Sequence, residues 1–174
     1  MIVIIILVIL AVPFIAASFL SKAYAIEREV IIDKPRQDVF DYIRIIKNQQ
    51  FYNKWVMADP GAKMEYRGTD GTIGFVSAWD SENKSVGKGE QEIIKINEGQ
   101  NIILEIRFVK PFEGVSHTHL NLIPISANQT LVKWSFTGAR NYTMKLFYLL
   151  FNLERKLGRD IDTSLNNLKA VLER

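Results

Sequence analysis

Cysteine is absent from the 174-residue chain, and histidine occurs only twice. Without cysteine the protein has no disulfide, no thiolate nucleophile and no cysteine-ligated metal. The chain also has little excess charge of either sign, because 22 Lys and Arg against 19 Asp and Glu leave a net charge of only +3. No run of Lys and Arg forms a basic patch, so the sequence predicts no nucleic-acid partner. The remaining composition is typical of a globular domain.

One long stretch, Ile2–Leu20, has no charged residue, and fourteen of its nineteen residues are Ile, Leu, Val or Phe. As a helix it would be about 28 Å long, close to the roughly 30 Å hydrocarbon core of a bilayer. This hydrophobicity outweighs the cost of Pro13 in mid-helix. We therefore predict a transmembrane anchor over residues 1–24 and one domain over residues 25–174.

Two other readings of this stretch stay open. A cleaved signal peptide would end at Ala23-Tyr24-Ala25, which has the small-x-small form of a cleavage site and would give a secreted or periplasmic protein. Against it, the charged n-region is missing and the apolar run exceeds the usual length. A buried core helix is the other reading. For an anchor, the positive-inside rule favours a single-pass protein of the cell membrane with a cytoplasmic domain, because all nearby basic residues follow the helix: Lys22, Arg28, Lys34 and Arg36. An exported domain behind an uncleaved signal anchor also remains open.

After the anchor the chain begins with a strand and short helices. Ala25–Asp33 is rich in β-branched residues and predicts a strand. Lys34-Pro35 predicts a helix start, and a second short helix is expected over Asn48–Trp55. Asp59-Pro60-Gly61 predicts a turn.

From residue 73 onward the apolar residues alternate, which predicts strands in an antiparallel meander joined by short turns. Val86–Ile96 is one of these strands, with Gly87 and Gly89 marking a bend or bulge. The others have the following residues on one face: Ile73, Phe75, Ser77 and Trp79; Ile102, Leu104, Ile106 and Phe108; Thr118, Leu120 and Leu122; Val132, Trp134 and Phe136.

The end of the chain predicts a long amphipathic helix that starts at Asn141 or Thr143 and runs to about Leu172. Its apolar stripe has spacings of three and four: Leu146, Leu150, Leu153, Leu157, Ile161, Leu165, Leu168 and Leu172. This stripe would cover the apolar face of the sheet. The fold class is therefore α+β, a curved antiparallel sheet around a long C-terminal helix, preceded by one transmembrane helix.

Several segments resemble one family in order and spacing: Glu27–Pro35 with Asp38–Ile43, Lys54-Trp55, Asp59-Pro60, Gly74 with Ser77–Trp79, Gly87–Gly89, Phe108 with Lys110–Gly114, and Val132–Trp134. The resemblance is to START-like (SRPBCC, polyketide cyclase/dehydrase-like) domains, in a subgroup often preceded by an apolar N-terminal helix. It implies a helix-grip fold with a deep apolar cavity. Members bind lipids, sterols, polyketides or other hydrophobic molecules, and a few catalyse cyclisation or hydrolysis. The family shares no catalytic motif, so no catalytic residue is assigned.

If the domain has such a cavity, bulky inward residues would line it. The candidates are Trp55, Phe75, Trp79, Phe108, Trp134, Phe136, Leu146, Leu150 and Leu153. A ligand pocket is typically apolar with few polar groups. The alternative for each residue is an ordinary place in the core.

No metal or cofactor is predicted. His117 and His119 share a strand face, which would suit a metal, but that face is the solvent side and the sequence offers no third ligand. Glu105 and Arg107 lie on the same outward face and predict an ion pair.

The preferred function is a membrane-anchored module that binds a hydrophobic small molecule or lipid. A cyclase- or hydrolase-like enzyme is the first alternative, and it needs an ionisable group inside the cavity, for which the residue types suggest Tyr42, Asp80, Glu90 and Glu92. A membrane-tethered stress or assembly factor acting through protein contacts is the second alternative. The sequence does not predict an oligomeric state.

Overall fold

The computed structural model describes residues 12, 15–139, 145, 146 and 152–174. The predicted transmembrane segment, residues 2–20, lies for the most part outside these residues. Within the part of the chain that the structure describes, no helix has the length and apolarity needed to cross a membrane.

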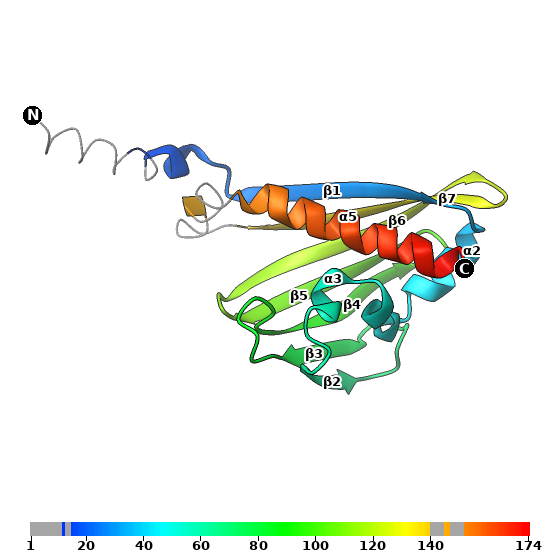
Figure 1. The fold of residues 1–174 in the computed structure, drawn as a ribbon, viewed down its shortest axis with the longest axis horizontal. Helices are drawn as coiled ribbons and strands as arrows, with labels where there is room; N and C mark the ends of the chain where they lie inside the picture. The colour runs from blue at the N-terminus through cyan, green and yellow to red at the C-terminus, as the bar shows by residue number, and fades with distance from the viewer. Residues whose placement is uncertain (1–11, 13–14, 140–144, 147–151) are drawn as a thin grey trace, which may run out of the picture.

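A seven-stranded antiparallel sheet forms the body of the domain, with the strand order β1-β7-β6-β5-β4-β3-β2 (Figure 1). The strands are β1 Ala23–Ile32, β2 Lys63–Arg67, β3 Val76–Asp80, β4 Lys88–Asn97, β5 Asn101–Lys110, β6 Gly114–Ser126 and β7 Gln129–Ala139. Strands β2 to β7 follow one another in a meander, and the alternating pattern predicts this for β3 to β7. The first strand then pairs with the last, from Ala23 opposite Ala139 to Ile32 opposite Thr130.

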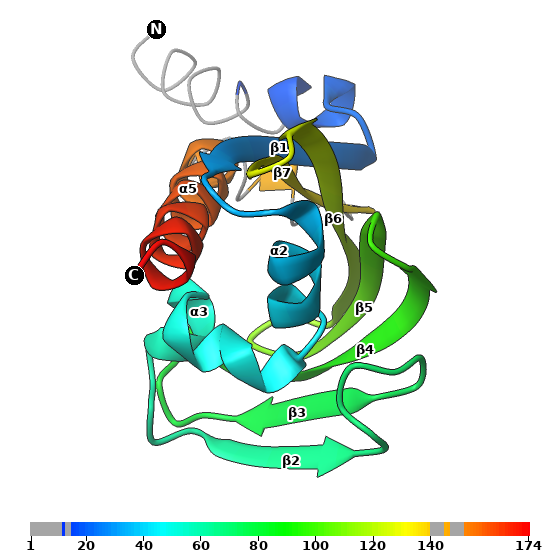
Figure 2. The same cartoon turned by 90° about the vertical axis from the view of Figure 1, so that its right-hand side faces the viewer.

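The inner face of the curved sheet carries the core. In β5, Ile102 and Leu104 are buried, whereas the alternating residues Ile103 and Glu105 face outward. The sheet curves around the helices, with α2, α3 and α5 on its concave side (Figure 2). This arrangement confirms the predicted α+β architecture, a curved antiparallel sheet with a C-terminal helix.

The C-terminal helix α5 spans Leu153–Leu172 and runs along β1 (Figure 1). Its predicted stripe faces the core at Ile161, Leu165 and Leu168. The predicted start at Asn141 or Thr143 lies outside the described residues. The helix predicted from there to Leu172 is interrupted at Asn152, the N-cap of α5, which has a left-handed backbone with φ of 46°. A regular helix cannot continue through that conformation.

The short helices differ in detail from the prediction. Helix α2 spans Arg36–Ile43 directly after Pro35. The single helix predicted over Asn48–Trp55 is two pieces, a 3-10 helix η1 over Ile46–Phe51 and a one-turn helix α3 over Lys54–Met57. Asn53 separates them because its side chain accepts a hydrogen bond from the Trp55 backbone N–H at 3.0 Å and so caps α3.

Strand β2 is not among the predicted strands, and its five residues are all exposed. The predicted strand face that began at Ile73 starts later, because Ile73 precedes β3 and is 61% exposed.

Candidate functional site

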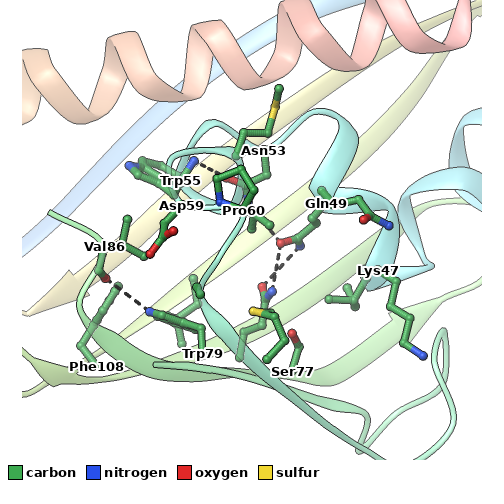
Figure 3. Close-up of a pocket in the computed structure, with 18 of the residues that line it drawn as sticks. Lys47, Gln49, Asn53, Trp55, Asp59, Pro60, Ser77, Trp79, Val86 and Phe108 are labelled. Carbon is green, nitrogen blue, oxygen red and sulfur yellow. Dashed lines mark hydrogen bonds between the residues drawn. The ribbon is translucent and has the colours of Figure 1, made fainter. Parts of the chain in front are cut away.

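A cavity of about 550 Å³ lies between the η1–α3 segment and the inner face of the sheet (Figure 3). The helical side contributes Ile46, Lys47, Gln49, Gln50, Trp55, Val56 and Met57, with Asn53, Asp59, Pro60 and Ala62 from the flanking loops and Leu157 from α5. The sheet side contributes Met64, Tyr66, Ser77, Trp79, Gln91, Ile106, Phe108 and Phe136, with Ser85 and Val86 from the β3–β4 loop. The wall is mostly apolar, as in small-molecule sites.

Aromatic rings form two parts of this wall. Trp79 and Phe108 meet edge to face at 6.2 Å between ring centroids, and the Trp79 indole donates a hydrogen bond to the Val86 carbonyl at 3.3 Å. The Trp55 and Phe136 rings form the second part of the wall, with 6.1 Å between their centroids. Gly89 stands opposite Trp79 in the next strand, and a Cβ there would come within 2.7 Å of the indole. The wall therefore depends on a glycine beneath this tryptophan.

Replacing Gly89 by alanine is expected to lower the free energy of unfolding by about 2 kcal/mol, the usual cost of overpacking. The new methyl would lie 2.6 Å from the Arg107 carbonyl oxygen as well as against Trp79, so backbone must shift. Urea unfolding measures the change. Gly114→Ala is the matched control, since a Cβ at Gly114 meets nothing within 4 Å. Equal stability of both variants would contradict the prediction.

Three amide side chains form a buried cluster on the cavity wall. The Gln49 Nε2 donates to Gln91 Oε1 at 3.3 Å, and the Gln91 Nε2 donates back to Gln49 Oε1 at 2.9 Å. Asn53 Nδ2 also donates to Gln49 Oε1, at 3.1 Å. The exposed fractions are 2% for Gln49, 6% for Asn53 and 9% for Gln91. The cluster ties η1 and the α3 cap to strand β4.

Among the residues that the structure describes, two charged side chains line the cavity, and each already has a partner. The Asp59 carboxylate accepts hydrogen bonds from the Ser81 hydroxyl at 2.5 Å and from the Gly61 backbone N–H at 3.1 Å. The Lys47 ammonium lies over the Tyr66 ring, 4.6 Å from its centroid. Neither group is an isolated acid or base.

Contacts with α5 hold the helix α3 that carries Trp55. The Lys54 ammonium pairs with the Asp160 carboxylate at 2.5 Å. The Lys54 backbone N–H donates to the Ser164 hydroxyl at 3.0 Å, and that hydroxyl donates to the Asp160 carbonyl at 2.8 Å. The C-terminal helix therefore fixes one wall of the cavity.

Behind this wall, Tyr52 and Trp134 are packed edge to face at 6.3 Å in the core. Among the described residues, the Tyr52 hydroxyl and the Trp134 indole N–H are the two fully buried side-chain polar atoms without a hydrogen-bond partner. Burial raises the pKa of Tyr52 strongly, and the neighbouring Tyr42 raises it further. Burial also raises the pKa of Tyr42.

The nine residues predicted to line the cavity divide into groups. Trp55, Trp79, Phe108 and Phe136 lie on its wall. Phe75 and Trp134 instead pack in the core. Leu153 is half-buried, and neither it nor Leu146 is among the lining residues. Leu150 lies outside the described residues. A role of any of these in ligand binding stays a prediction.

The polar part of the cavity wall was not predicted from the sequence. The inward positions of β4 are Gly89, Gln91 and Ile93. The alternation of the sequence therefore already placed the polar side chain of Gln91 on the inner face. Ser77 was counted on the correct strand face without a role. Gln49 and Asn53 had no such signal, because their positions depend on the break between η1 and α3.

The ionisable residues suggested for an enzymatic role do not lie on the cavity wall. Glu90 and Glu92 pair with Arg107 at 2.8 and 2.7 Å on the outer face of the sheet, where Glu105 also pairs with it at 2.5 Å as predicted. Asp80 pairs with Lys88 at 2.5 Å, which lowers the pKa of this carboxyl. None of these carboxylates, nor Tyr42, lines the cavity.

The two histidines share the outer face with that network. His117 lies 3.5 Å from Glu105, whereas burial and the neighbouring His117 lower the pKa of His119. The described residues contain no group of three His, Asp or Glu placed to hold a metal.

Residues 24–173 match the family model described as polyketide cyclase/dehydrase and lipid transport. No curated protein matches the sequence.

Solved structures with the same fold include a Thermobifida fusca protein, 15% identical, with a TM-score of 0.63 over 85% of this chain and 92% of that one. Norcoclaurine synthase from Thalictrum flavum, solved with dopamine and hydroxybenzaldehyde, is 14% identical, with a TM-score of 0.61 over 87% and 88% of the two chains. The di-domain ARO/CYC StfQ from the steffimycin biosynthetic pathway is 12% identical, with a TM-score of 0.64 over 87% of this chain and 51% of that one.

Proposed function

This chain belongs to the polyketide cyclase/dehydrase and lipid transport family, and from that membership we propose that it binds a hydrophobic small molecule or lipid in the cavity beneath η1 and α3. The cavity itself is the observation that carries the proposal. Its volume of about 550 Å³ lies within the range of roughly 300–1,000 Å³ found for small-molecule sites.

The character of the wall supports the same proposal. Trp55, Trp79 and Phe108 offer large apolar surfaces, and burying them against a ligand removes that surface from water. Norcoclaurine synthase, which shares the fold, was solved with dopamine and hydroxybenzaldehyde, both of which contain an aromatic ring. We propose that this chain also accepts a ligand that contains a ring. We propose binding without a reaction because the charged side chains on the described wall, Lys47 and Asp59, already have partners.

The proposal predicts saturable binding of the apolar fluorescent probe N-phenyl-1-naphthylamine by the full chain. Ile106→Trp is expected to weaken this binding about tenfold, because Ile106 lines the cavity and the indole would occupy part of it. Probe fluorescence during titration measures the affinity.

Ile103→Trp is the matched control for that experiment. Ile103 lies on the same strand but does not line the cavity, so the probe should bind this variant as it binds the wild type. Failure of the wild type to bind the probe, or equal losses in both variants, would overturn the proposal.

We further propose that the domain is tethered to the cell membrane as a single-pass protein with the domain on the cytoplasmic side. The apolar stretch Ile2–Leu20 supports this, together with the basic residues that follow it. Strand β1 starts at Ala23 beside Ala139, at the end of the sheet where Val115 and Phe112 are half exposed. Half-exposed apolar side chains at this end would suit a membrane surface nearby.

Alkaline extraction of membranes from cells that express the full chain tests the tether. Retention of the full-length chain in the membrane fraction would support it. A mature chain that begins at Ile26 by mass spectrometry would instead favour the signal peptide and remove the tether. Release of the full-length chain into the soluble fraction would overturn both.

A further inference from the structure

We propose that Ser77 and Gln91 form a polar anchor within the cavity that binds the carbonyl oxygen of an uncharged, otherwise apolar ligand. This inference rests on the proposed function, since it needs a ligand in the cavity. It adds the chemical class of that ligand: a neutral aromatic or alicyclic ketone, quinone or lactone, in preference to the corresponding hydrocarbon.

The two side chains lie next to each other by register. Ser77 in β3 stands directly opposite Gln91 in β4, and both side chains line the cavity from the inner face of the sheet. Directly opposed residues of an antiparallel pair have Cβ atoms about 5 Å apart, so their polar ends can reach one oxygen atom. Ser77 is 2% exposed and Gln91 is 9% exposed, so water is largely excluded from both.

The Ser77 hydroxyl is the main reason to infer a hydrogen-bond acceptor on the ligand. It lies on the wall of the cavity, and no hydrogen bond joins it to any other residue drawn in Figure 3. Because this hydroxyl faces the cavity, it can donate a hydrogen bond to an acceptor on a ligand bound there.

The amide cluster next to Ser77 has unused donors. A side-chain amide has two N–H donors, and its oxygen accepts two hydrogen bonds. Gln49 Oε1 has both positions filled, by Asn53 and Gln91. Gln91 Nε2 donates once within the cluster and keeps one N–H, so an acceptor beside Ser77 can take a hydrogen bond from each of the two side chains.

The anchor is uncharged, which limits the ligand group that it suits. No ionised side chain takes part in the hydrogen bonds among Gln49, Asn53 and Gln91. Burying a carboxylate or an ammonium there would cost far more than two neutral hydrogen bonds return. A carbonyl oxygen accepts two hydrogen bonds and is neutral, so it matches the donors that the wall offers.

A matched pair of probes tests the inference. 9-Fluorenone and fluorene have the same three rings and differ only in a carbonyl group in place of a methylene. We expect the full-length wild type to bind fluorenone about fivefold more tightly, as for one or two net hydrogen bonds. Trp55 and Trp79 line the cavity, so quenching of tryptophan fluorescence reports binding of either probe.

Ser77→Ala is expected to weaken fluorenone binding about fivefold and to leave fluorene binding unchanged. Gln91→Met, close in size to glutamine, should also remove the preference for the ketone, and urea unfolding checks that this variant is folded. Ser116→Ala is the control, because Ser116 is a buried strand serine whose hydroxyl bonds to Tyr24 and which does not line the cavity.

The outcomes separate the two proposals. Equal affinity of the wild type for both probes, or equal losses for both probes in Ser77→Ala, would overturn the polar anchor and leave the binding cavity intact. Absence of binding for both probes and for N-phenyl-1-naphthylamine would overturn the proposed function and the anchor with it.

Discussion

Trp134→Ala is expected to lower the free energy of unfolding by about 3–5 kcal/mol, the range for removing a large aromatic side chain from a packed core. Trp134 is 2% exposed and contacts Tyr52 and Trp55 edge to face, each at 6.3 Å between centroids. Truncation would leave a void between the sheet and the segment that holds the cavity wall. Urea unfolding followed by far-ultraviolet circular dichroism measures the loss.

Trp134→Phe is the control for this prediction. It keeps an aromatic ring and removes the indole N–H that has no partner among the described residues. Its loss of stability should be clearly smaller than that of the alanine variant. A loss below about 1 kcal/mol for Trp134→Ala would mean that the aromatic contacts contribute little, contrary to the packing described above.

Alkaline pH is expected to destabilise the protein through Tyr52. The pKa of this phenol is raised in the folded state, whereas in the unfolded chain it has its ordinary value of about 10. Below pH 10 both states keep the proton, so the group has no effect on stability. Above pH 10 only the unfolded state releases it, and unfolding becomes easier by about 1.36 kcal/mol per pH unit. The expected loss from this group is about 2 kcal/mol between pH 10 and pH 12, because the unfolded phenol is already half ionised at pH 10.

Tyr52→Phe removes the titrating group, so the variant should become more stable than the wild type as the pH rises from 10 to 12. Tyr66→Phe is the matched control, since Tyr66 is 43% exposed and its removal should leave the alkaline loss in place. Free energies of unfolding at several pH values measure both. Parallel pH dependence of the wild type and Tyr52→Phe would rule out Tyr52 as the cause.

Periodicity was sufficient to predict most of the sheet and its cover. In β5 and β7 every second residue is apolar along most of the strand, because one face is buried and the other carries Glu105, Arg107 and Lys133. The stripe of α5 was visible for the same physical reason, since Ile161, Leu165 and Leu168 all meet the core. The START-like resemblance, supported by the family match, then added the helix-grip arrangement.

Other features depend on tertiary contacts that no local pattern encodes. Strand β2 is an exposed edge strand of five residues, with Lys63, Glu65 and Arg67 on one face and only Met64 and Tyr66 on the other, so its apolar signal is short. The break between η1 and α3 depends on the Asn53 side chain, and the start of α5 depends on the left-handed Asn152.

The candidate site was predictable only in part for the same reason. Trp79 and Phe108 were assigned to the cavity from their strand face, but Phe75 on that face packs in the core. Alternation identifies the inner face of a sheet and does not distinguish the part beneath a cavity from the part beneath a packed helix. The Gln49–Gln91 pair joins residues 42 positions apart, which periodicity does not reveal.

The pairing of β1 with β7 has a consequence for how the chain acquires its structure. Ile26 and Phe136, opposed in the sheet, are separated by 110 positions along the chain, so the first strand waits for its neighbour until the other strands have been synthesised. Closing so long a loop costs conformational entropy before the β1–β7 contacts can stabilise the chain, so this pairing is expected to form slowly. We expect slow refolding in which the β2–β6 hairpins form early and β1 joins late. Until then, a nascent strand with Val30, Ile31 and Ile32 is open to pairing with other chains.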